Sequence, residues 1–112
     1  MSPLTTHVLD TARGRPAAGI AVTLERAAGD GFEVVARRVT DEDGRVRDLL
    51  PEGGLRASTY RIGFELDPYY AAQGTKGFYP YAQIVFRVED PAQHHHVPLL
   101  LSPYGYQTYR GS

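Results

Sequence analysis

Three consecutive histidines at positions 94–96 are the most chemically suggestive feature of this 112-residue sequence. If the segment is a β-strand, alternation places His94 and His96 on one face and His95 on the other. Two imidazoles on one face could bind zinc, although no carboxylate or third histidine is tied to them by spacing. A solvated strand entrance is the plainer interpretation of the run taken alone, because histidine is tolerated on surfaces.

Two other residues could complete a catalytic site with these histidines. His7 shares one face of a strand-like segment with Leu9, a position where a lone histidine is usually structural. Arg45 directly follows an Asp43-Gly44 pair, which predicts a tight turn and places the arginine at a strand start or loop tip. An imidazole, an arginine fork and a second imidazole could together activate water and hold an anionic heterocycle.

The C-terminal segment YGYQTYRGS, residues 104–112, is aromatic and rich in hydrogen-bonding groups up to its last residue. Chain ends are normally frayed, so the segment is either a ragged edge strand or an end that is held for a purpose. No Ser-His-Asp spacing is present, so Tyr109 and Ser112 are expected to shape a pocket rather than act as nucleophiles.

β-strands are the elements that would position these residues. Apolar residues recur with period two, and Gly or Pro clusters interrupt them at intervals of about ten residues. Strands are expected near 20–25, 32–39, 60–66, 82–88, 94–101 and 104–109, in addition to the segment around His7. Asp67 as N-cap, Pro68 at the first helical position and Gly74 as the stop predict one short helix. The fold class is therefore all-β, a two-sheet sandwich of seven or eight strands in a single domain over residues 1–112.

Composition excludes several classes of function. The 12 basic residues nearly balance the 13 acidic ones, so no field of one sign would attract nucleic acid. Cysteine is absent, which rules out disulfides, thiolate nucleophiles and Cys-ligated zinc. No stretch approaches the roughly 18 apolar residues of a membrane span, and the first residues lack a signal-peptide pattern, so we expect no membrane association and a cytoplasmic location.

Four motifs resemble the 5-hydroxyisourate hydrolases of the transthyretin-like family. They are LTTHVLD at 4–10, DGR at 43–45, HHHVPLLLSPYGY at 94–106 and YRGS at 109–112, in the same order and across the whole chain. The terminal YRGS is the most specific, because it separates the hydrolases from the transthyretin hormone carriers, which also lack the matching histidines. The family usually has tyrosine where this chain has His95, a side chain expected to face away from its two neighbours.

The resemblance implies a transthyretin-like (prealbumin-like) sandwich and a set of site residues. The catalytic residues would be His7, Arg45 and His96, and the substrate-binding residues would be His94, Tyr109, Arg110, Gly111 and Ser112. The small-molecule substrate would be 5-hydroxyisourate, with no metal or organic cofactor. The assembly would be a homotetramer with its sites in a channel between subunits, and Val97, Leu99, Tyr104 and Tyr106 could line a second apolar surface.

The implied reaction opens the substrate's six-membered ring in urate catabolism, giving 2-oxo-4-hydroxy-4-carboxy-5-ureidoimidazoline. His7 or His96, with an ordinary pKa near ~6.5, could accept the proton of the attacking water, and the sequence does not choose between them. Arg45 could bind urate-like oxygens through two hydrogen bonds and stabilise developing charge. A non-catalytic carrier of the transthyretin kind is the main alternative, ahead of a metal-binding or adhesive module that uses the histidine run.

Overall fold

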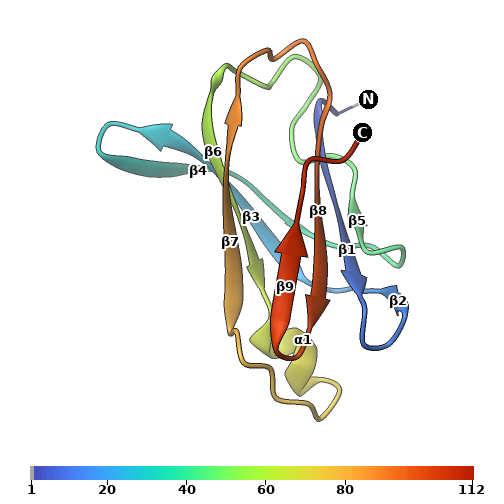
Figure 1. The fold of residues 1–112 in the computed structure, drawn as a ribbon. Helices are drawn as coiled ribbons and strands as arrows, with labels where there is room; N and C mark the ends of the chain where they lie inside the picture. The colour runs from blue at the N-terminus through green and yellow to red at the C-terminus, as the bar shows by residue number, and fades with distance from the viewer. Residues whose placement is uncertain (1) are drawn as a thin grey trace.

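Two β-sheets and one short helix make up the computed structural model, which describes residues 2–112 (Figure 1). The first sheet has the strand order β2-β1-β8-β9, with β5 also paired to β1 on the edge opposite β8, and the second has the order β4-β3-β6-β7. The strands of the first sheet are β1 (Leu4–Asp10), β2 (Arg15–Pro16), β5 (Arg45–Val46), β8 (His95–Ser102) and β9 (Gly105–Thr108). Those of the second are β3 (Ala21–Ala28), β4 (Gly31–Val39), β6 (Ser58–Glu65) and β7 (Tyr81–Val88), with α1 (Asp67–Ala71) between β6 and β7.

The two-sheet sandwich with one short helix is confirmed. The structure has nine strands in residues 2–112, instead of seven or eight, because β2 and β5 contain two residues each. Two residues are too few to show a periodic pattern, so periodicity did not reveal them, and only the turn before Arg45 pointed to a strand start at β5. The helix α1 has five residues, and no helix in the described chain is long and apolar enough to cross a membrane.

The core lies between the inner faces of the two sheets. Tyr60, Ile62 and Phe64 of β6 are buried at alternate positions, as the period-two pattern predicts. Val97 and Leu99 of β8 are also core residues, with exposures of 6% and 0%. The suggestion that these two residues line a second apolar surface is therefore wrong, since their face of β8 packs inward.

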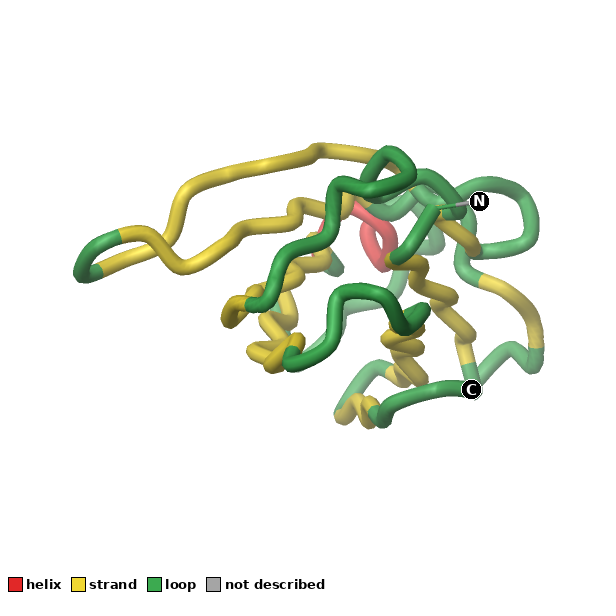
Figure 2. The backbone as a smooth tube through the Cα atoms, turned by 90° about the horizontal axis from the view of Figure 1, so that it is seen from above, coloured by secondary structure: helices red, strands yellow, loops and turns green. Residues whose placement is uncertain are grey.

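The β3–β4 hairpin extends well beyond the two layers (Figure 2). The turn between the two strands forms around Gly29, and the β3–β4 register shifts between Leu24 and Glu25, which marks a β-bulge. Arg61 of β6 binds Glu25 through two hydrogen bonds of 2.9 and 3.0 Å and lies 4.2 Å from the centre of the Phe32 ring. These contacts hold the base of the hairpin against the neighbouring strand β6.

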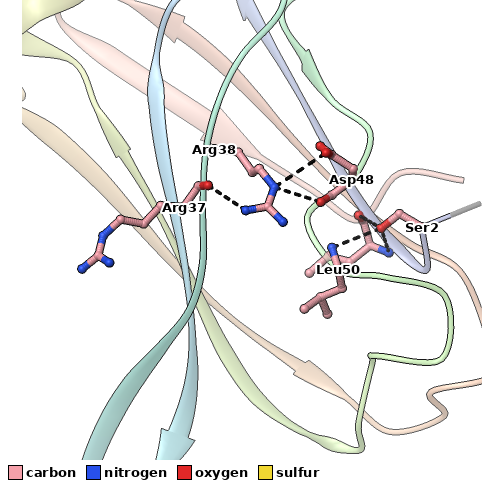
Figure 3. Close-up of polar contacts among 6 residues, drawn as sticks. Ser2, Arg37, Arg38, Asp48 and Leu50 are labelled. Carbon is pink, nitrogen blue, oxygen red and sulfur yellow. Dashed lines mark hydrogen bonds and ion pairs between the residues drawn. The ribbon is translucent and has the colours of Figure 1, made fainter.

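Polar contacts also hold the segment that follows β5 (Figure 3). Arg38 Nε of β4 donates to the backbone oxygen of Asp48 at 3.1 Å and lies 3.7 Å from its carboxylate. The backbone N–H of Leu50 donates to Ser2 Oγ at 3.3 Å. The chain leaving β5 is thus tied to both β4 and the N-terminal segment.

Helix α1 begins at Asp67, one residue earlier than the sequence predicts. The N-cap position is Leu66, and no side chain caps the helix, so the expected capping role of Asp67 is wrong. Pro68 lies in the first turn of the helix. N–H groups there have no intrahelical acceptor, so proline, which lacks an N–H, costs the helix no hydrogen bond. Gly74, with a φ of 68°, closes the turn that follows the helix.

A buried carboxylate anchors this helix to β1, which gives a stability prediction. Asp10 is 1% exposed, and its Oδ2 accepts a 2.7 Å hydrogen bond from the Tyr69 hydroxyl. Tyr69→Phe should lower the free energy of unfolding by about 1.5–3 kcal/mol, because it removes a hydrogen bond to a buried charged group. Urea unfolding at pH 7 measures this change.

Tyr70→Phe is the matched control for that measurement. No group within residues 2–112 forms a hydrogen bond with the buried Tyr70 hydroxyl, so its removal should not destabilise the protein. Equal unfolding free energies for the Tyr69 variant and the wild type would contradict the anchoring role of Asp10.

Candidate active site

Strand β1 brings the three expected catalytic residues onto one face of the first sheet. It pairs antiparallel with β5, where His7 lies opposite Arg45, and parallel with β8, where Thr5 lies opposite His96. Paired residues share a face, as do residues two apart on a strand. The side chains of these four residues therefore lie together on the outer face of the sheet.

An open depression of about 290 Å³ lies on this face. It is lined by Thr5, Thr6, Arg45, Arg47, His94, His96 and Ser112. His7, half-buried, lies next to the depression opposite Arg45. The N- and C-terminal segments meet at this end of the molecule, so the site combines residues from both ends of the chain (Figure 1).

The C-terminal tail is held against His96. The backbone N–H of Gly111 donates to the His96 carbonyl at 2.9 Å, forming an isolated β-bridge, and Arg110 Nη2 donates to Gln93 Oε1 at 3.2 Å. A Cβ atom on Gly111 would lie 2.5 Å from His96 Cδ2. The tail is therefore so close to the imidazole that only glycine fits at position 111. This attachment brings Ser112 to the depression.

Tyr109 and Arg110 line a different cavity from Arg45. That cavity, of about 260 Å³, also contacts Ile84 and Phe86 of β7. His96 lines both spaces. The structure therefore places His94 and Ser112 at the depression, Gly111 against His96, and Tyr109 and Arg110 in the second cavity.

A threonine connects the two outward-facing histidines. Thr5 Oγ1 lies 3.1 Å from His94 Nε2 and 2.8 Å from His96 Nδ1, within hydrogen-bond distance of both. His95 faces the opposite way, as predicted: it is 5% exposed, and its Nδ1 is 2.9 Å from the Gln93 carbonyl oxygen. The change from the family's usual tyrosine thus lies on the core side of β8.

A tight turn before β5 fixes Arg45. Asp41 Oδ1 accepts hydrogen bonds from the backbone N–H groups of Asp43 and Arg45, both at 2.9 Å. Gly44 has a φ of 72°, and a Cβ there would collide with the Val8 carbonyl oxygen, so both conformation and space require glycine. The turn predicted from Asp43-Gly44 is confirmed, and it delivers Arg45 at the start of β5.

The two arginines near the depression differ in their partners. Arg47 forms ion pairs with Asp41 at 2.8 Å and with Asp43 at 3.3 Å. Within residues 2–112, no carboxylate forms an ion pair with the Arg45 guanidinium. Arg45 is therefore free to bind an anionic or carbonyl oxygen of a ligand with its planar fork.

Both candidate bases are held neutral near pH 7. Burial lowers the pKa of His7, and the Arg45 guanidinium lowers it further, against smaller opposing effects from Asp41 and Asp43. Burial also lowers the pKa of His96, assisted by Arg45 and the neighbouring histidines. A neutral imidazole has a free lone pair, so either ring can accept a proton from water.

A family model described as HIUase/Transthyretin matches residues 4–111. The chain belongs to this family. A relative from Rhizobium meliloti named 5-hydroxyisourate hydrolase 2 is 46% identical, and the match covers 97% of this chain and 95% of the relative.

Solved structures from the HIUase/Transthyretin family have the same fold as this chain. Klebsiella pneumoniae 5-hydroxyisourate hydrolase is 36% identical with a TM-score of 0.84, and the match covers 97% of this chain and 98% of the other. Sea bream transthyretin in complex with thyroxine is 33% identical with a TM-score of 0.90, covering 97% and 94%. The family thus includes both proteins named as hydrolases and a protein solved with a bound hormone.

Three residues that line the depression, Thr5, Thr6 and Arg47, were not among those expected from the sequence. Thr5 could have been found by counting two residues back from His7 along β1, and Arg47 by counting two forward from Arg45. Residues 2–112 contain no group of three or more His, Cys, Asp or Glu side chains placed to hold a metal ion.

Proposed function

We propose that this protein hydrolyses 5-hydroxyisourate to 2-oxo-4-hydroxy-4-carboxy-5-ureidoimidazoline. The observation that carries the proposal is Arg45, which forms no ion pair with a carboxylate of residues 2–112 and lies beside two neutral imidazoles at an open depression. The names of the Rhizobium and Klebsiella relatives support the same substrate. Acyl hydrolysis needs a positioned water, a base, and a donor for the developing oxyanion, and these side chains supply the last two.

In the proposed mechanism, His7 or His96 takes a proton as water attacks a ring acyl carbon. A C–O bond forms, and the carbonyl oxygen gains negative charge that the Arg45 guanidinium stabilises. The C–N bond then breaks, and the imidazolium returns the proton to the leaving ring nitrogen. His94 and Ser112, which line the depression, hydrogen-bond the bound ring.

The direct test is a kinetic assay on freshly made substrate. Urate oxidase generates 5-hydroxyisourate in place, and the decay of its near-ultraviolet absorbance is compared with the spontaneous rate. Decay that accelerates in proportion to added protein is the expected result. Unchanged decay with folded protein would overturn the proposal in favour of the carrier alternative.

The proposal extends to a homotetramer in the cytoplasm, built from one domain spanning residues 1–112. Strands β7 and β9 are the edges of their sheets, and several aromatic side chains near them are exposed. These are Phe78, Tyr79, Tyr81, Tyr104, Tyr106 and Tyr109. Exposed aromatic patches next to free edges favour association with further subunits. Analytical ultracentrifugation tests the expected tetramer, and a monomer at micromolar concentration would contradict it.

The lowered pKa values of the two histidines predict the pH dependence of ring opening. A general base works only when unprotonated, so kcat/KM should fall as pH falls through the pKa of the free enzyme's base. Because the pKa of both His7 and His96 is lowered, the midpoint should lie below ~6.5, with a plateau at neutral pH. Initial rates between about pH 5 and pH 8, corrected for spontaneous decay at each pH, measure it. A midpoint above ~6.5 would contradict the lowered pKa of the histidine that acts as the base.

A further inference from the structure

One hydroxyl group forms contacts with two histidine rings. Thr5 Oγ1 lies 2.8 Å from His96 Nδ1 and 3.1 Å from His94 Nε2. A hydroxyl has one hydrogen to donate, and its oxygen lone pairs only accept. The hydroxyl can donate to only one ring, so both contacts are hydrogen bonds of neutral rings only if at least one histidine donates an N–H to Oγ1. The tautomers of the two rings are therefore coupled through Thr5.

The surroundings of His96 favour one of the two possible directions. The His96 ring lines the depression together with Arg45, and its Nδ1 lies within hydrogen-bond distance of Thr5 Oγ1. Arg45 acts on the same ring, and its guanidinium can only donate. A lone pair on Nε2, the nitrogen not bound to Thr5, suits this environment better than an N–H.

We propose that Thr5 is a positioning residue that sets the tautomer of His96 by accepting its Nδ1–H and donating to His94 Nε2. This leaves the Nε2 lone pair of His96 available to the attacking water. The inference rests on the proposed hydrolase function for its catalytic consequence. Its structural content, the coupled tautomers, stands on the two contacts of the hydroxyl alone.

The same contacts provide a path for charge to leave the site. When His96 Nε2 takes a proton from water, the Nδ1 proton can pass to Thr5 Oγ1 as the threonine hydrogen passes to His94 Nε2. One O–H and one N–H bond break and one of each forms, so the hydroxyl is restored. The positive charge moves from half-buried His96 to exposed His94, where water solvates it better.

Three variants test the role of Thr5. Thr5→Val keeps the β-branched shape and removes the hydroxyl, whereas Thr5→Ser retains the hydroxyl. Thr23→Val is the matched control, because Thr23 is a half-buried strand residue of the other sheet, away from the depression. Long-range ¹H–¹⁵N NMR of histidine-labelled protein near pH 7.5 reports which ring nitrogen of His96 carries hydrogen.

The expected result has a spectroscopic and a kinetic part. His96 should be the Nδ1–H tautomer in the wild type, in Thr5→Ser and in Thr23→Val, and should shift toward Nε2–H in Thr5→Val. In the assay, Thr5→Val should lower kcat by about ten- to a hundredfold, as expected for loss of a hydrogen bond to a group that becomes charged, with KM nearly unchanged. Thr5→Ser should restore most of kcat.

The two readouts distinguish failure of this inference from failure of the proposed function. An Nε2–H tautomer in the wild type, or an unchanged tautomer and kcat in Thr5→Val, would overturn the role of Thr5. A tautomer shift in Thr5→Val together with an inactive wild type would support the coupling through Thr5 and overturn only the hydrolase proposal.

Discussion

Replacing His96 with asparagine is expected to lower kcat for ring opening by about 10²- to 10⁴-fold, and His7→Asn should have an effect in the same range. Asparagine can occupy much of the imidazole's space and form hydrogen bonds, but it cannot take a proton from water near neutral pH. Both rings lie beside the Arg45 guanidinium, where a base would meet the attacking water. The urate oxidase-coupled assay measures each variant.

His95→Asn is the matched control for both substitutions. It makes the same chemical change in the same histidine run, but on the buried face of β8. Its kcat per folded molecule should stay within about twofold of the wild type, with circular dichroism giving the folded fraction. Near-normal rates in both His7→Asn and His96→Asn would exclude an imidazole base. If only one variant loses the acid limb of the pH profile, that histidine is the base.

Local periodicity was enough to predict most of the strands. The apolar alternation of β6 is a property of consecutive residues, and burial of Tyr60, Ile62 and Phe64 confirms it. Strand pairing is not local: the parallel ladder between β1 and β8 joins Thr5 to His96, 91 positions apart. No spacing rule in a single sequence determines such a register, so residues alone could not show which side chains meet.

Family resemblance, more than spacing, led to His7, Arg45 and His96, and the structure places them together. Thr5 was missed because threonine is common in strands and needs no special explanation there. Its significance depends on two interatomic distances, to His94 and His96, that only coordinates provide. The turn before Arg45 was predictable because the two adjacent residues Asp43 and Gly44 favour a tight turn through their own backbone preferences.

The contact between Gly111 and His96 leads to the second large expected effect. Gly111 does not have a positive φ, so alanine fits the backbone conformation and any loss comes from the added methyl group. That methyl would lie 2.5 Å from His96 Cδ2, a distance that forces the imidazole or the tail to move. Because misplacing a catalytic group by about 1 Å can cost about 10²-fold, Gly111→Ala should reduce kcat by about that factor.

Gly105→Ala is the control for this substitution. Gly105 also lies near the C-terminus, in β9, and a Cβ there would meet only Ser102 Oγ at an ordinary 3.9 Å. Its kcat should match the wild type, and thermal unfolding should show both variants folded. A Gly111→Ala variant with wild-type kcat would mean that the tail, and not the ring, moves to relieve the contact. The tail would then affect the site through Ser112, which lines the depression.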